Sequence, residues 1–246
     1  MIDIRDNQYD HNRLLESKDK QDTILLYQAG LQLDRFKQRV VVQDHTLAMS
    51  KRPHLVDFDW DLIHRSYSDW GLVDAYYVLK PILQYIVENS NPVSRHSKSK
   101  GLLIWSNRPD TGKTSLLNWI KSFAPYYQWP DDTWFQPYTN DLYQWIIWDE
   151  VSFLKWEHTF LNNFMAGNAM ALSVKHSHAF KKDNPALLMA SNFNLKYHVE
   201  DRWRSNEVIL QALRTRVLEI ELTSPLFHDY NQWYSLMEKA KVTKIT

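Results

Sequence analysis

The middle of the chain has the residue types and order of a phosphate-binding loop. The apolar run Gly101-Leu-Leu-Ile-Trp105 is followed by Ser-Asn-Arg-Pro-Asp-Thr-Gly-Lys-Thr-Ser, and apolar residues at helical spacing come next. In such a strand, loop and helix, loop amides and the Lys113 ammonium bind phosphates, the Thr114 hydroxyl binds Mg²⁺, and the helix start adds its positive end. The expected nucleotide-binding residues are Asn107, Arg108, Pro109, Asp110, Thr111, Gly112, Lys113, Thr114 and Ser115.

One position departs from the pattern G-x-x-x-x-G-K-[ST], because Asn107 stands where the first glycine is expected. That position calls for a residue that can adopt positive φ, and Asn visits the left-handed region at little cost. We therefore retain the motif and expect Asn107 in that conformation. The alternative is a chance Gly-Lys-Thr after an apolar run, which the flanking strand-like and helix-like segments disfavour.

Two further apolar runs end in polar residues suited to ATP hydrolysis. Tyr143-Gln-Trp-Ile-Ile-Trp-Asp-Glu150 has the pattern of a Walker B strand. Asp149 can hold Mg²⁺ through its waters, and Glu150 can polarise the water that attacks the γ-phosphate. Pro185-Ala-Leu-Leu-Met-Ala-Ser-Asn192 is the second such run, and Asn192 can sense the γ-phosphate. An ordinary strand followed by an Asn turn is the alternative for the second run.

Cationic residues gather in two places after these motifs. A basic hairpin is expected between 171 and 182, with Phe180 in it, and its cations would suit a nucleic-acid backbone. Reading its histidines as metal ligands is disfavoured because no third ligand is near, and a solvated hairpin without function remains an alternative. Arg214 and Arg216 lie where a helix-like segment meets a strand, and a neighbouring subunit's arginine can stabilise phosphoryl transfer. The candidate DNA-binding residues are Lys175, His176, His178, Lys181 and Lys182.

The elements that must position these residues alternate in an α/β manner. Apolar runs at Trp145–Trp148, Leu161–Met165, Ala186–Met189 and Val217–Leu222 alternate with helical stretches. We divide the chain into a polar N-terminal segment at 1–22, a helical region at 23–90, a linker at 91–100 and an ATPase domain at 101–246.

Composition limits the classes of function that remain. The 246 residues are 44% hydrophobic, and 29 Lys and Arg balance 29 Asp and Glu, so any nucleic-acid contact must come from a local patch. The absence of cysteine excludes disulfides and thiolate chemistry. No apolar stretch approaches the roughly 20 residues that span a bilayer. We therefore expect a soluble, intracellular protein with no membrane partner.

The ordered set of motifs over 101–222 resembles a superfamily 3 helicase, an AAA+ ATPase of small DNA viruses. The P-loop, the Asp-Glu strand, the basic hairpin and the strand ending in Ser-Asn follow one another as in that family. Gln211-Ala-Leu-Arg-Thr-Arg-Val217 is similar to its arginine-finger region, especially in Rep proteins of circular single-stranded DNA viruses. Arg216 matches the finger better than Arg214.

This resemblance implies a homo-oligomeric ring, expected to be a hexamer, that hydrolyses ATP with Mg²⁺ at subunit interfaces and draws single-stranded DNA through its pore. The catalytic residues would be Lys113, Asp149, Glu150, Asn192 and Arg216, with Mg²⁺ at Thr114 and Asp149, and 23–90 would be the oligomerisation collar. In a virus of eukaryotes such a protein would act in the host nucleus. The alternatives are an AAA+ switch or loader, a 2C-like RNA virus ATPase acting on RNA, and a nucleotide-binding scaffold with a weakened P-loop.

Overall fold

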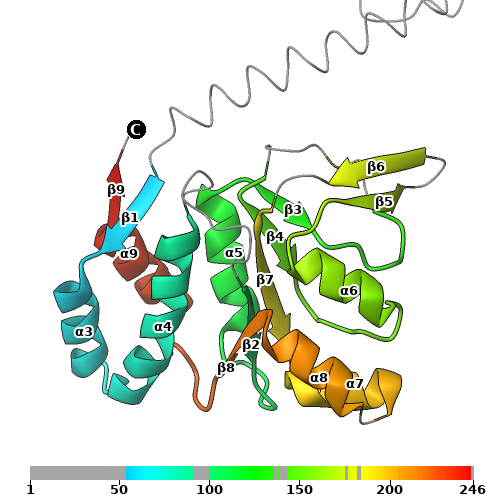
Figure 1. Cartoon of the computed structure of the whole chain (residues 1–246). Coiled ribbons are helices and arrows are strands. Elements are labelled where there is room, and N and C mark those ends of the chain that lie inside the picture. The colour runs from blue at the N-terminus through cyan, green and yellow to red at the C-terminus, as the bar shows by residue number, and fades with distance from the viewer. Residues whose placement is uncertain are drawn as a thin grey trace, which may run out of the picture. The chain divides into compact units, whose positions relative to one another are not determined.

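The computed structural model describes residues 54–90, 100–135, 138, 143–174, 177–181, 184–204 and 206–244. Only the backbone is described at His54, Val174, Ser177, His178 and Lys244. The described part from 54 onward belongs to one compact unit that spans 52–246 (Figure 1).

A five-stranded parallel sheet forms the centre of this unit. Its strand order is β3-β4-β7-β2-β8, so β7 lies between the strand that precedes the P-loop and the strand that ends directly before Asp149. This arrangement confirms the α/β fold class with a central parallel sheet. The strands are β2 (Gly101–Trp105), β3 (Tyr126–Gln128), β4 (Trp145–Trp148), β7 (Ala186–Ser191) and β8 (Val217–Glu221).

Helices cover both faces of the sheet because its strands are apolar on both faces. Leu102 and Ile104 contribute to the core on one face, whereas Leu103 between them contributes to the core on the other, as the period of a strand requires. The first face carries α3 (Trp60–Asp69), α4 (Val73–Asn89), α5 (Lys113–Phe123) and α9 (Tyr230–Ala240). The second carries α6 (His158–Met165), α7 (Leu195–Trp203) and α8 (Glu207–Arg214).

Residues 54–90 share their core with the ATPase part of the chain. The apolar face of α4, which includes Leu79, Ile82 and Ile86, packs in the same cluster as Leu102 of the sheet. In addition, β1 (His54–Phe58) pairs antiparallel with β9 (Lys241–Lys244). The core of this unit therefore includes both α4 and the central sheet.

Two local expectations had different outcomes. The apolar run Leu161–Met165 lies in α6 rather than in a strand, because a short buried run does not by itself distinguish the two. The hairpin between 171 and 182 is confirmed for the described residues, since β5 (Met170–Val174) pairs antiparallel with β6 (Ser177–Lys181). Within the described ranges no helix is long and apolar enough to cross a membrane.

Candidate nucleotide site

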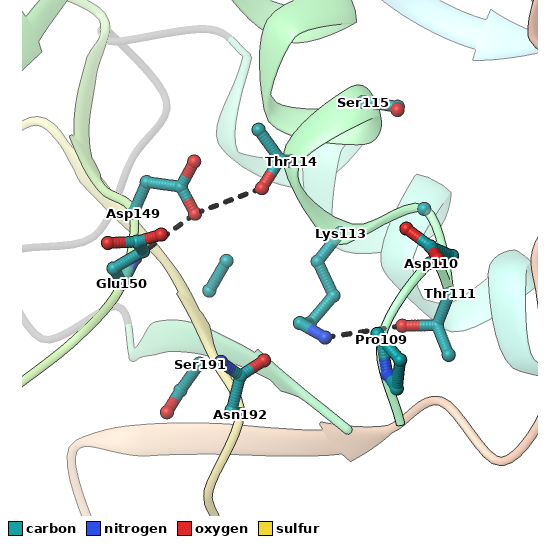
Figure 2. A pocket seen from close by; sticks show the side chains of 12 residues that line it. Pro109, Asp110, Thr111, Lys113, Thr114, Ser115, Asp149, Glu150, Ser191 and Asn192 are labelled. Carbon is teal, nitrogen blue, oxygen red and sulfur yellow. Dashed lines mark hydrogen bonds between the residues drawn. The ribbon is translucent and has the colours of Figure 1, made fainter. Parts of the chain in front are cut away.

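The segments that follow β2, β4 and β7 meet at one edge of the sheet and enclose a cavity of about 200 Å³ (Figure 2). The carboxyl ends of parallel strands point the same way, so these segments converge where α/β sheets commonly bind ligands. The cavity is lined by Pro109, Asp110, Thr111, Gly112, Lys113, Thr114, Ser115, Asp149, Glu150, Ala190, Ser191 and Asn192.

The P-loop turns into α5 at a glycine whose conformation requires that residue type. Gly112 has φ of 93° and is the N-cap of α5. A Cβ there would lie 3.0 Å from the Phe227 ring. The expectation that Asn107 takes positive φ is wrong, because among the described loop residues other than glycine it is Asp110 that does so, with φ of 54°. Asp tolerates this region because its short side chain can bond locally.

Lys113 points into the cavity with much of its hydrogen-bonding capacity unused (Figure 2). Among the described residues its Nζ donates only to neutral oxygens, at 3.3 Å to Oγ1 of Thr111 and at 3.4 Å to the carbonyl of Arg108. Burial lowers the pKa of Lys113, and the nearby Asp149 and Asp110 partly offset this. Because an ammonium has three donors, phosphate oxygens can replace these long contacts.

The carboxylates after β4 face the first turn of α5. Oγ1 of Thr114 donates to Oδ1 of Asp149 at 3.4 Å, and the Glu150 amide donates to the same oxygen at 3.1 Å. The backbone of Glu150 has φ of 51°, an uncommon value away from glycine that is often found at functional sites. A hydroxyl and a carboxylate that converge in a polar cavity form an oxygen donor set that fits Mg²⁺ together with phosphate and water.

The end of β7 brings Asn192 to the same cavity, beside Ser191. β7 is fully buried between β2 and β4, with Ala190 accepting a hydrogen bond from the Val151 amide at 2.9 Å. Asn192 therefore directly follows the strand that lies between the P-loop strand and the strand before Asp149.

Three of the residues expected to take part in nucleotide binding or hydrolysis lie outside the lining of this cavity, as far as the described residues show. Arg108 donates from Nη1 to the carbonyl of Thr223 at 3.2 Å, and Asn107 precedes it in the loop. Arg216 turns back on α8, where its Nη1 donates to the carbonyl of Ala212 and to Oγ1 of Thr215.

The candidate DNA-binding residues are only partly within the described structure. Lys175, His176 and Lys182 lie outside the described residues, and for His178 only the backbone is described, paired with Ser173. The side chain of Lys181 is 0% exposed, and its Nζ lies 5.1 Å from the centre of the Phe164 ring. Its side chain thus packs inside the protein, unlike the exposed position that we expected on the hairpin.

The residues that hold the P-loop in place were missed in the sequence. The Leu226 amide donates to the carbonyl of Thr111 at 3.1 Å, and the Leu226 carbonyl accepts a hydrogen bond from the hydroxyl of Tyr67 at 2.8 Å. Phe227 packs against Gly112. No local pattern could have indicated these contacts, because they join segments more than a hundred residues apart.

The comparisons with known proteins give a match to a family model. No curated protein matches the sequence at a significant level. The family model described as papillomavirus helicase matches residues 63–244, which include every described residue of the cavity lining. Papillomavirus helicases are superfamily 3 helicases, so the resemblance of the motifs to superfamily 3 is confirmed. Since the match covers well over half of the sequence, the chain belongs to the papillomavirus helicase family.

Proposed function

We propose that the protein is the ATP-dependent DNA helicase of a viral replication initiator of the Rep type, and that it hydrolyses ATP to move on single-stranded DNA. The observation that carries the proposal is the convergence of Lys113, Thr114, Asp149, Glu150 and Asn192 around one cavity. Membership of a viral helicase family supports it at the coarser level.

Each of these five residues has a chemical role in this proposal. Amides at the start of α5 and the ammonium of Lys113 bind the β- and γ-phosphates. Thr114 and Asp149 would hold Mg²⁺, which neutralises phosphate charge. Glu150 orients the attacking water, and the Asn192 amide donates to the γ-phosphate.

The finer proposal places ATP at the interface between subunits of a homo-oligomer, with a hexamer as the expected ring. Arg216 would supply the arginine to the neighbouring subunit's ATP, because it lies outside the lining of its own chain's cavity. The segment between β5 and β6, which contains Lys175 and His176, would contact the DNA backbone.

The test is ATP hydrolysis by wild type and Lys113→Ala, each with and without single-stranded DNA. We expect DNA to stimulate hydrolysis by the wild type, and we expect the substitution to lower the rate at least about 100-fold, as for loss of an electrostatic contact in a site. Lys121→Ala is the matched control, since Lys121 lies in the last turn of the same helix and contacts Tyr126 instead.

Other outcomes would redirect the proposal. Hydrolysis that is indifferent to single-stranded DNA, with no strand displacement, would favour an AAA+ switch or loader. Stimulation by RNA rather than DNA would favour a 2C-like ATPase. Tight nucleotide binding without any hydrolysis would indicate a nucleotide-binding scaffold whose site has no catalytic activity.

A further inference from the structure

His198 lies on α7 and contacts the end of β7. Its side chain is 4% exposed, and Nε2 lies 2.7 Å from Oγ of Ser191. Ser191 lines the nucleotide cavity and immediately precedes Asn192. The histidine is therefore one hydrogen bond away from the cavity, although it does not line it.

The Ser191 hydroxyl joins the two sides of Asn192. Besides its contact with His198, Oγ accepts a hydrogen bond from the Phe193 amide at 2.9 Å. The carbonyl of Ser191 accepts from the Ser106 amide at 3.2 Å, next to the P-loop. The residues on both sides of Asn192 are thus fixed through one hydroxyl group, whose remaining partner is the histidine ring.

The Asn192 side chain depends on this backbone for its position. In the described part of the chain it makes no hydrogen bond of its own, although it faces the cavity (Figure 2). An amide that must donate to a phosphate oxygen needs its backbone held to within a fraction of an ångström, since small misplacements cost much of the rate.

The ring of His198 also packs against the segment that follows Asp149 and Glu150. Phe153 is 1% exposed, and its ring centre lies 5.1 Å from that of His198. Burial lowers the pKa of His198 to about 4, so the ring is neutral near pH 7 and Nε2 can accept the Ser191 proton. The histidine thus contacts both catalytic segments, after β4 and after β7.

The far end of the Asn192 segment is held separately. The Leu195 amide donates to Oε1 of Glu219 at 2.9 Å, and the Tyr197 amide donates to Oδ1 of Asn194 at 2.8 Å. The first bond fixes the start of α7 to β8, and the second caps the helix locally. The near end of the segment is left to Ser191 and His198.

From these contacts we infer that His198 is a positioning residue, which acts through Ser191 to hold the Asn192 amide where it meets the γ-phosphate. The inference rests on the proposed function, because it assumes that Asn192 acts on bound ATP. It adds that the rate of hydrolysis depends on a buried ring that touches no nucleotide.

The test compares His198→Leu, which removes the hydrogen bond, with His198→Gln, whose amide can restore it. We expect His198→Leu to lower kcat about tenfold, with the Kd for a fluorescent ATP analogue unchanged within about twofold, and His198→Gln to recover most of kcat. The control is Asn206→Ala, which removes the N-cap of the neighbouring helix α8 and should leave kcat per folded molecule unchanged.

Amide hydrogen exchange of Phe193 provides a readout that does not need turnover. We expect faster exchange in His198→Leu and restored protection in His198→Gln. A His198→Leu variant with wild-type kcat and unchanged exchange at Phe193 would overturn the inference. So would a loss of activity that is explained entirely by a smaller folded fraction, which is the behaviour expected of Asn206→Ala. Should His198→Leu fail to fold, Ser191→Ala removes the same hydrogen bond and should lower both kcat and the protection of the Phe193 amide. Adding His198→Gln to Ser191→Ala should then have no further effect.

The two proposals can fail separately. A wild-type protein that hydrolyses no ATP would refute the proposed function, whereas the exchange of Phe193 would still decide whether His198 holds the segment.

Discussion

The hydroxyl of Thr114 and the carboxylate of Asp149 are joined by a hydrogen bond of 3.4 Å in the lining of the cavity. The bond connects the first turn of α5 to the residue that follows β4. In the sequence, β3 lies between these two elements. Both oxygens belong to the donor types that Mg²⁺ prefers, which is why we propose that this pair would hold the metal.

Replacing Thr114 with Val should weaken the use of Mg²⁺ more than the binding of nucleotide. The substitution keeps the shape of the side chain and removes the hydroxyl. We expect the Mg²⁺ concentration for half-maximal ATP hydrolysis to rise about tenfold, as metal sites commonly respond to the loss of one supporting group. Ser122→Ala is the control, because its hydroxyl bonds to Trp119 in the last turn of the same helix. An unchanged Mg²⁺ titration would contradict this role for Thr114.

Arg216→Ala should abolish turnover while leaving ATP binding intact. The expected loss in kcat is about 1,000-fold, typical of an arginine finger. Arg214→Ala is the matched control, since Arg214 lies two residues earlier and pairs with Glu207 at 3.9 Å. Mixing Arg216→Ala with Lys113→Ala should restore part of the activity, because one subunit retains an intact P-loop and the other an intact arginine. Absence of complementation would argue against a role in trans.

Gly112→Ala should destabilise the protein more than Gly71→Ala does. Both glycines have positive φ, 93° and 70°, so each substitution costs about 1–2 kcal/mol of backbone strain. A Cβ at Gly71 would meet nothing within 4 Å, whereas one at Gly112 would press on the Phe227 ring. Urea unfolding should therefore show an additional loss of about 1 kcal/mol for Gly112→Ala. Equal losses of unfolding free energy in the two variants would show that the Phe227 ring can move away from the new Cβ without destabilising the protein.

The buried His198 should make the protein less stable in mild acid. Burial lowers its pKa from 6.5 to about 4, so the unfolded chain binds more protons between these values. The free energy of unfolding should fall as the pH drops below about 6.5, and His198 should account for about 2 kcal/mol of that fall at pH 5. His198→Gln should lose correspondingly less between pH 7.5 and 5 in urea unfolding. Parallel losses in the two proteins would mean that the ring can charge within the fold.

The local sequence determined the motifs and the elements that carry them. The strand before the P-loop, the helix from Lys113 and the strand ending at Asp149 could be predicted because each needs a particular local order of apolar and polar residues. The parallel sheet followed from their alternation. Asn192 and Asp149 could be expected at one edge because both follow apolar strands.

Only the tertiary structure decided how these motifs are held. The contacts of Leu226 with Thr111, of Phe227 with Gly112 and of His198 with Ser191 depend on which helix packs on which face of the sheet. The same packing placed positive φ at Asp110 instead of Asn107 and took the Lys181 side chain into the interior. The order of residues determines which chemical groups a loop carries. Burial and long-range hydrogen bonds determine its backbone conformation, and these depend on residues far away in the sequence that a local pattern does not contain.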